Sequence, residues 1–302
     1  MTSIQVGAKA IYEGLQRAVE TKTGFLVGRF GTVECDVLHW LEHLPSAACP
    51  QEQRDVLERN AGVFPSDIES VVSWGSASRG AYQRADILAT GWFVPMAEKE
   101  KELLGVWLWK GTQVPLRSLE PYYVDAEERW TRLLAGRRVC AVTSFADTAA
   151  RQVKKGEAVV WGGEMKLLGN QETRWSFVRT GYAPCLALGR AGWELEDGES
   201  PVCWEDAVEW TVRQVVGTAA EIVIIGCGGL GMIIGARLKA LGKAVIVLGG
   251  ATQVLFGIKG ERWKRHQVIG QMWNSEWVWP SEEETPRGAE DVEGACYWLK
   301  PQ

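Results

Sequence analysis

The stretch from Ile222 to Trp263 holds the residues best suited to bind an anion. A run of β-branched residues opens it, and Gly226, Gly228 and Gly231 follow in the spacing G-x-G-x-x-G. Between a buried strand and a helix, such glycines bring backbone N–H groups and a helix N-terminus to one point, which favours phosphate. The stretch has no Asp or Glu before Glu261, although the whole chain is acidic. Both features indicate a negatively charged ligand.

The glycine spacing alone leaves other interpretations open. In a dinucleotide-binding unit, an acidic residue closes the second strand and binds a ribose hydroxyl. The second predicted strand is Ala244–Leu248, and Gly249 and Gly250 occupy the position of that acid. This disfavours a nicotinamide dinucleotide. The glycines also have a purely structural interpretation, in which they only let a helix pack closely on a strand.

A charged residue, Arg29, directly follows another predicted strand, and acidic residues stand a few positions later. Phe25–Gly28 is short and apolar, Arg29 follows directly, and Val33–Leu44 has the character of a helix. Turns of this kind are favoured places for ligands in an open α/β sheet. A charge directly after a buried strand also needs a partner. Arg29 therefore either forms a salt bridge with Glu34 or Asp36, or binds phosphate or positions a carboxylate.

Hydroxyl side chains follow a third predicted strand. Arg138–Val142 is apolar, and a helix is expected at Ala149–Lys154. Ser144 and Thr148 lie between them, where they either bind phosphate or cap the helix. Asp147 adds a carboxylate to the same turn.

The remaining elements show no clear domain boundary, and 302 residues suffice for one large α/β domain or two small ones. Apolar spacing and capping residues predict the helices, with Ser66 as the N-cap of one. Helices are expected at Val6–Thr21, Gln51–Asn60, Ser66–Ser73, Ala97–Trp109, Asp125–Leu134, Trp204–Val216 and Met232–Leu241, short strands at Ala158–Trp161 and Cys185–Leu188, and an irregular stretch at Lys110–Val124.

Composition restricts the class of protein. Hydrophobic residues make up 46% of the chain and charged residues 24%, as in ordered proteins, and the formal charge of -5 gives no global basic field for nucleic acid. The seven cysteines are scattered without a C-x-x-C pair, which disfavours a zinc site or a disulfide framework. The N-terminus lacks the pattern of a signal peptide, and the most apolar stretch is too short to span a membrane. A cytoplasmic protein is expected.

Histidines offer little support for a metal. His39 and His43 are spaced i, i+4 on one predicted helix, but no H-E-x-x-H pattern accompanies them. His266 lies in a basic segment far along the chain.

Several motifs occur together in a fixed order: GRFGTVE, TSFADT, IGCGGLG, LGGATQVLFGIKGERW and VEGACYW. With them the chain resembles, over nearly its whole length, the GT-D-type glycosyltransferases, the DUF1792-related family of bacterial and viral proteins. The resemblance implies one Rossmann-like α/β domain over residues 1–302, with a mostly parallel sheet, helices on both faces, and residues 222–263 as the nucleotide-binding βαβ core. The implied activity is transfer of a sugar from a nucleotide sugar to a hydroxyl.

The resemblance also implies a donor site. In the family, a D-x-E motif is associated with the metal and the sugar nucleotide, and its positions here are Thr32, Val33 and Glu34. A site for Mn²⁺ or Mg²⁺ would therefore rest on Glu34 without the family's Asp, and one carboxylate is a poor anchor for a hard cation. The implied donor-binding residues are Arg29, Gly31, Thr32, Ser144, Thr148, Gly226, Gly228, Gly231, Gly249, Gly250, Gln253, Phe256, Gly257, Lys259, Arg262 and Trp263.

A general base and an acceptor complete the expected reaction. Glu34 is the first candidate for the base of an inverting enzyme, followed by Asp147 and Asp36. The acceptor is a glycan or polysaccharide, or a hydroxymethylated DNA base if the source is a phage or virus. A non-catalytic nucleotide- or saccharide-binding protein and a dinucleotide-dependent oxidoreductase are the alternatives. If the site is real, GRFGTVE and the glycine turn must lie at the same edge of the sheet.

Overall fold

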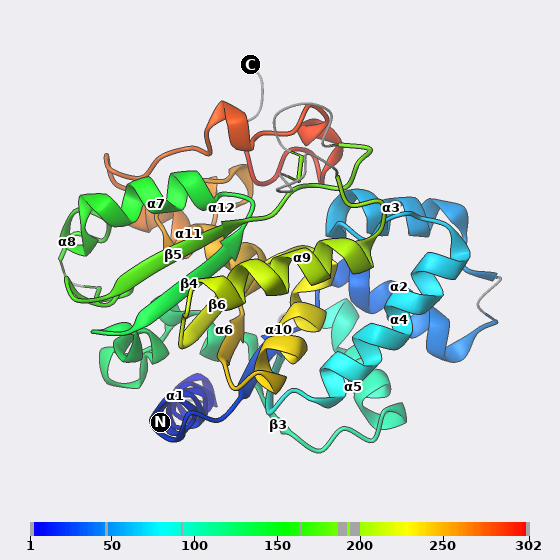
Figure 1. Ribbon diagram of the computed structural model, residues 1–302, viewed down its shortest axis with the longest axis horizontal. Coiled ribbons are helices and arrows are strands. Elements are labelled where there is room, and N and C mark those ends of the chain that lie inside the picture. The colour runs from blue at the N-terminus through cyan, green and yellow to red at the C-terminus, as the bar shows by residue number, and fades with distance from the viewer. Residues whose placement is uncertain are drawn as a thin grey trace.

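A parallel seven-stranded sheet forms the centre of the computed structural model (Figure 1), in the order β3-β2-β1-β7-β6-β4-β5. The structure describes residues 3–45, 48–91, 93–163, 165–186, 192–193 and 200–299. This architecture confirms the expected α/β class. The strands are β1 (Phe25–Arg29), β2 (Ile87–Thr90), β3 (Thr112–Pro115), β4 (Arg138–Thr143), β5 (Arg174–Arg179), β6 (Ile222–Gly226) and β7 (Ala244–Val247).

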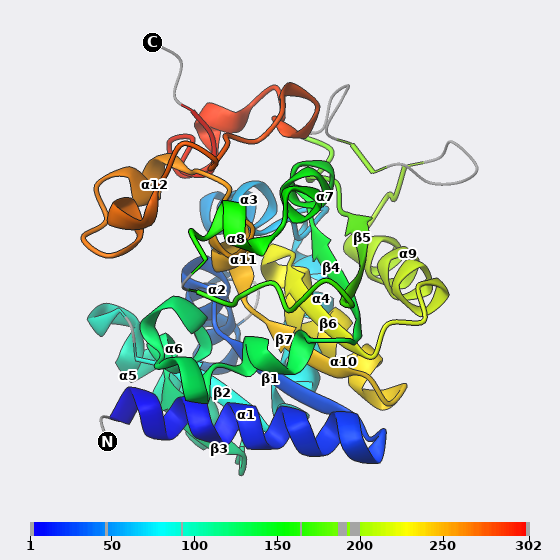
Figure 2. The same ribbon diagram turned by 90° about the vertical axis from the view of Figure 1, so that its left-hand side faces the viewer.

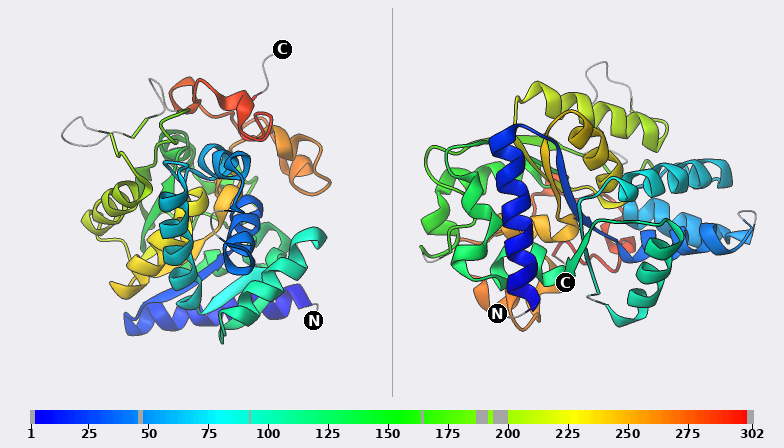
Figure 3. Two further views of the ribbon diagram at one scale, coloured as in Figure 1. Left: turned by 90° about the vertical axis from the view of Figure 1, so that its right-hand side faces the viewer. Right: turned by 90° about the horizontal axis from the view of Figure 1, so that it is seen from below.

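Helices cover both faces of the sheet (Figures 2 and 3). The core on one face is closed by α2 (Thr32–His43), α3 (Gln51–Ala61), α4 (Ile68–Gln83), α5 (Val94–Val106), α9 (Trp204–Gly217) and α10 (Gly231–Ala240). The other core is closed by α1 (Ser3–Thr21), α6 (Leu116–Leu119), α7 (Ala146–Lys155), α8 (Glu157–Val160) and α11 (Thr252–Leu255). The short helix α12 (Glu261–Lys264) and several 3-10 turns follow. No helix among the described residues is long and apolar enough to cross a membrane.

Alternation along the central strands explains why both faces need cover. In β6, Ile222 and Ile224 enter one core, whereas Val223 and Ile225 enter the other. All four side chains are fully buried. A strand buried on both faces reads as an unbroken β-branched run, which is why this strand was recognisable from the sequence.

The strand order opens the carboxyl edge of the sheet. The helices that follow β4 and β6 lie on opposite faces, and so do those that follow β1 and β7. Loops that leave neighbouring strands in opposite directions create a crevice at the carboxyl ends of the strands. Since β7 pairs with both β1 and β6, the turn after Arg29 and the turn after Gly226 lie at one edge. This confirms the expected neighbourhood of the two motifs.

Several predicted elements were wrong. Helix α4 starts after Asp67, whose carboxylate accepts a hydrogen bond from the Ser70 N–H, so Asp67 and not Ser66 is the N-cap. The segment expected as one helix at Asp125–Leu134 forms two 3-10 helices. The stretch expected as a strand at Ala158–Trp161 instead contains α8.

Two strands at the edges of the sheet were missed. Strand β3 falls inside the stretch expected to be irregular, and β5 has only one fully buried residue. Edge strands expose part of their side chains and therefore lack a strong apolar pattern. The strand expected at Cys185–Leu188 begins as a turn at Cys185 and Leu186, and its other residues lie outside the described part of the chain.

Glu284 anchors the C-terminal segment, drawn red in Figure 1, to helix α7. Its buried carboxylate accepts hydrogen bonds from the N–H and hydroxyl of Thr148 and from the N–H and hydroxyl of Ser281. The carboxylate therefore links two segments that are far apart in the sequence.

We expect Glu284→Ala to destabilise the protein by about 2 to 4 kcal/mol, because it leaves several buried donors without an acceptor. Chemical denaturation measures this difference. Glu290→Ala, at an exposed position in the same segment, is the matched control and should change stability by less than about 0.5 kcal/mol. Equal effects of the two substitutions would contradict the anchoring role.

Candidate active site

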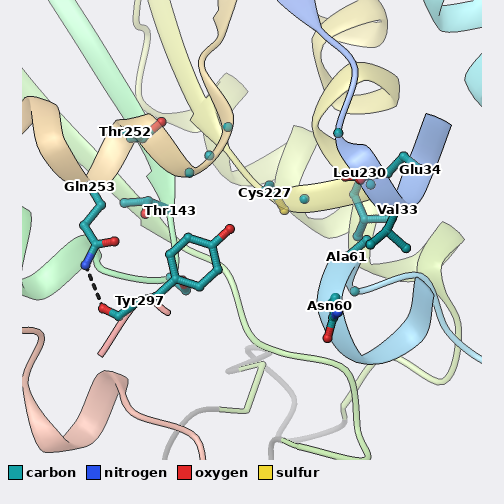
Figure 4. Close-up of a pocket in the computed structure, with 18 of the residues that line it drawn as sticks. Val33, Glu34, Asn60, Ala61, Thr143, Cys227, Leu230, Thr252, Gln253 and Tyr297 are labelled. Carbon is teal, nitrogen blue, oxygen red and sulfur yellow. Dashed lines mark hydrogen bonds between the residues drawn. The ribbon is translucent and has the colours of Figure 1, made fainter. Parts of the chain in front are cut away.

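A cavity of about 430 Å³ lies at the carboxyl edge of the sheet. Figure 4 shows Thr252, Gln253 and Tyr297 on one side of it and Glu34 and Asn60 on the other. Segments that follow six of the strands line it, together with the C-terminal segment. The lining residues that the sequence singled out are Arg29, Gly31, Thr32, Glu34, Ser144, Gly226, Gly228, Gly249, Gly250, Gln253, Arg262 and Trp263.

Two of the candidate bases do not line the cavity. Asp36 forms an ion pair with Lys99 of helix α5. Asp147 is more than half exposed and lies 3.8 Å from the Arg179 guanidinium. Glu34 alone of the three candidates faces the cavity, so neither Asp36 nor Asp147 is used in the reaction proposed below.

Five of the expected donor-binding residues also lie outside it. Thr148 lies inside α7, whose N-terminus has no side-chain cap, so the expected capping role is wrong. Its hydroxyl donates a hydrogen bond to the Glu284 carboxylate. Phe256 packs edge-on against Trp175 and Phe177 in the core. The other three are Gly231 at the start of α10, Gly257, whose carbonyl accepts a hydrogen bond from Gln152, and Lys259, whose ammonium lies over the Trp273 ring.

Glu34 belongs to the first turn of α2 and folds back over its N-cap, Gly31. A Cβ at position 31 would overlap with this carboxylate, so any other residue there would displace the Glu34 side chain. Burial raises the pKa of Glu34, and Glu293 also raises it, while its own backbone N–H and Arg29 oppose the change. A carboxyl whose pKa is raised toward neutrality suits a general base.

Arg29 lies across the end of β1 beside the end of β7. Its Nε donates to the Phe30 carbonyl at 2.8 Å, and its Cδ is 3.7 Å from where a Cβ of Gly249 would stand. Gly249 has a φ of +66°, which favours glycine. A Cβ at Gly250 would lie 3.0 Å from the Tyr297 ring and 3.3 Å from the Arg262 guanidinium. The two glycines thus form a strip of backbone without side chains, with Arg29 at one end and Tyr297 and Arg262 at the other.

Close packing also explains some of the glycines. At Gly228, with a φ of +43°, a Cβ would lie 2.5 Å from the Ala61 carbonyl oxygen. At Gly226 it would lie 2.7 Å from the Thr252 hydroxyl. The structural interpretation therefore holds for these two positions, whether or not they also bind a ligand.

The VEGACYW segment closes one side of the cavity. Glu293 forms an ion pair with Arg262, and the Tyr297 hydroxyl accepts a hydrogen bond from the same guanidinium at 3.2 Å. The Arg262 guanidinium lies 4.5 Å from the centre of the Tyr297 ring. Gln253 donates to the Tyr297 carbonyl at 2.8 Å, which ties the segment to α11. Arg262 is therefore held in place, with its charge largely balanced by Glu293.

Several functional candidates were missed from the sequence. Glu120, Arg117 and Tyr123 form part of the cavity wall near His266, and Arg117 lies over the Tyr123 ring. Burial raises the pKa of Glu120 to about 7, against the opposing effect of Arg29 and Arg117. No motif marks these residues. The only signal was that Arg117 and Glu120, a basic and an acidic residue, lie close together in the stretch predicted to be irregular.

Unpaired buried polar atoms are concentrated in this cavity. Within the described part of the chain, side-chain atoms of six lining residues are buried without a hydrogen-bond partner. Each such atom costs about 1 to 3 kcal/mol unless something else satisfies it. The cluster indicates a polar ligand. The atoms are Arg59 Nε, Asn60 Oδ1, Trp193 Nε1, Thr252 Oγ1, Gln253 Oε1 and Trp263 Nε1.

The acids of the cavity do not fit a resident divalent cation. Glu34 is folded over Gly31, Glu293 is paired with Arg262, and burial disfavours the charged form of Glu120. Among the described residues, the one group of three His, Cys, Asp or Glu side chains with ligand spacing lies elsewhere, at His39, His43 and Glu102. A hard cation needs several oxygen ligands, which the carboxylates of this cavity do not supply together.

Comparisons with known proteins give one distant likeness. No protein-family model and no curated protein matches the chain. A similar solved structure is described as a new glycosyltransferase (DUF1792) from Streptococcus sanguinis. The two chains are 12% identical, 91% of this chain and 94% of that chain are covered, and the TM-score is 0.43. A likeness this distant does not define an activity, which must be judged from the cavity itself.

The raised pKa of Glu120 should make the stability of the folded protein depend on pH. Its folded pKa of about 7 exceeds the usual 4.5, so the folded protein loses stability from this group as pH rises from about 4.5 to 7. Glu120→Gln removes the charge. We expect the variant to gain about 2 kcal/mol relative to the wild type between pH 5 and pH 8, since one pKa unit is worth about 1.4 kcal/mol and solvent screens part of it.

Urea denaturation of both proteins at pH 5 and pH 8 measures this change. Glu20→Gln, on the exposed side of α1, should show no such pH dependence. A stability difference between Glu120→Gln and the wild type that stays constant with pH would show that Glu120 is not held in a charge-disfavouring environment.

Proposed function

We propose that this protein is a glycosyltransferase that moves a sugar from a nucleotide-sugar donor to a hydroxyl acceptor. The observation that carries the proposal is the meeting of Arg29, Glu34 and the bare backbone at Gly249–Gly250 in one cavity. These residues come from the ends of β1 and β7, about two hundred residues apart in the sequence. A cation, a carboxylate and an accessible backbone are the groups that this transfer requires.

The donor diphosphate lies over Gly249–Gly250 in this proposal. Arg29 stands at one end of the strip and Arg262 at the other. The absence of side chains at both positions lets phosphate oxygens approach the backbone. Both guanidinium groups are placed to stabilise the negative charge of the diphosphate.

Glu34 is the general base. Its carboxylate takes the proton of the acceptor hydroxyl as that oxygen attacks the anomeric carbon of the sugar. The bond from that carbon to the diphosphate oxygen breaks, and the nucleoside diphosphate leaves with the bonding electrons. Arg29 stabilises the charge that develops on the leaving group. The raised pKa of Glu34 increases its basicity for this step.

The donor set of the cavity supports transfer without a resident divalent cation. Arg29 and backbone N–H groups take the place of a metal at the diphosphate. A saccharide acceptor is favoured over DNA, because the chain carries a formal charge of -5. Hydroxymethylated DNA remains an acceptor to be tested beside oligosaccharides.

Incubation with nucleotide sugars tests the donor. We expect one of the uridine, thymidine or guanosine diphosphate sugars to raise the thermal unfolding midpoint and to release nucleoside diphosphate, with EDTA present as well as absent. Ligand binding to the folded state raises stability by mass action. Binding of NAD instead would favour an oxidoreductase, and binding without release a non-catalytic protein. No binding of any nucleotide or nucleotide sugar would sink the proposal.

Replacement of Glu34 tests the base. Glu34→Gln keeps the size of the side chain and should lower kcat by about 10²- to 10⁴-fold, the usual contribution of a general base, with little change in donor affinity. Activity of the wild type should fall as pH drops through the raised pKa of Glu34, because the protonated carboxyl accepts no proton. Steady-state kinetics across pH measure both effects.

Asp36→Asn is the matched control, since it changes a carboxylate in the same helix outside the cavity. It should keep kcat close to the wild-type value. Turnover by folded Glu34→Gln equal to that of the wild type would remove Glu34 from the reaction.

A further inference from the structure

Two histidines and a glutamate meet on the surface away from the cavity. His39 and His43 belong to α2, and Glu102 comes from α5. The Glu102 Oε2 atom lies 2.5 Å from the Nε2 of His39 and 3.9 Å from that of His43. One ligand atom of each residue lies within 4.8 Å of the other two. None of the three lines the cavity.

The local structure explains this arrangement. Residues four apart on a helix share a face, so both imidazoles project from the same side of α2. Their ring centres are 4.4 Å apart. Helix α5 packs beside α2 and brings the Glu102 carboxylate to within 3.9 Å of both imidazoles. The sequence supplied the histidine pair, but only the fold adds the third ligand.

We propose that His39, His43 and Glu102 bind a zinc-like divalent transition metal ion. Two imidazoles and one carboxylate are a common ligand set for Zn²⁺, which prefers about 2.0 to 2.2 Å to each ligand in a tetrahedral site. Ligand atoms in such a site lie about 3.3 Å apart, between the two distances from Glu102. The ion replaces the hydrogen bond between His39 and Glu102, and both imidazoles and the carboxylate then coordinate it.

The surroundings favour this use. The side chains of His39, His43 and Glu102 are 25%, 36% and 53% exposed, so water has access to a fourth position on the ion.

The metal acts as a clamp between α2 and α5. One turn earlier in both helices, Asp36 and Lys99 already form an ion pair across the same contact. The ion adds a second, stronger connection toward the C-terminal end of α2. The N-terminus of this helix carries Glu34, but the site is independent of the proposed transferase activity and stands if that proposal fails.

Titration of the full-length, untagged protein with Zn²⁺ or Co²⁺ alone tests the site. We expect one ion per chain, a higher thermal unfolding midpoint, and for Co²⁺ the visible absorption of a four-coordinate ion without a thiolate charge-transfer band. The missing thiolate band separates this site from the cysteines, of which Cys185 is exposed.

Substitutions assign the ligands. His43→Ala and Glu102→Gln should each weaken metal binding at least tenfold and abolish the thermal shift, with an unchanged circular dichroism spectrum. Asp36→Asn, a nearby carboxylate in α2, should keep the affinity of the wild type. Binding that survives both ligand substitutions, or that shows a thiolate band, would overturn the proposal, as would no binding at all.

Discussion

The structure depends on one constraint, that every strand of a sheet buried on both faces runs parallel to its neighbours. Each parallel connection must cross over the sheet, so all carboxyl ends of the strands meet at one edge. The order of the strands then divides the following helices between the two faces. The cavity is the space that this division leaves, and its lining comes from turns that are remote in sequence.

Two arginines, Arg29 and Arg262, bring positive charge to that cavity. Arg262 is paired with Glu293 and held against the Tyr297 ring, which makes it a fixed part of the wall. Arg29 instead influences the pKa of both Glu34 and Glu120 from the end of β1. Because it acts on two buried carboxyls at once, an anion bound at Arg29 would raise the pKa of each. Ligand binding and protonation in this cavity are therefore coupled.

Some of this was predictable from the sequence because central strands carry an unbroken apolar pattern. That pattern located β4, β6 and β7, and the residues directly after them identified Gly249, Gly250 and Ser144 as lining residues. Edge strands β3 and β5 carry no such pattern, so the wall near Glu120 was missed.

Side-chain direction was the other source of error. Phe256 and Lys259 belong to a motif whose backbone passes the cavity, but their side chains turn toward other aromatic residues. Asp36 follows Glu34 by two positions on a helix and so points to a different side, where it meets Lys99. The motifs located the segments near the cavity but not the direction of each side chain, which the packing of the helices determines.

The central claim is that a nucleoside diphosphate binds across the ends of β1 and β7. A crystal structure of the protein with the nucleoside diphosphate of its donor tests this most directly. We predict the two phosphates over Gly249–Gly250, with Arg29 in contact with a phosphate oxygen and Glu34 facing the vacant sugar position. Phosphates bound outside this cavity, or out of reach of Arg29, would contradict the account.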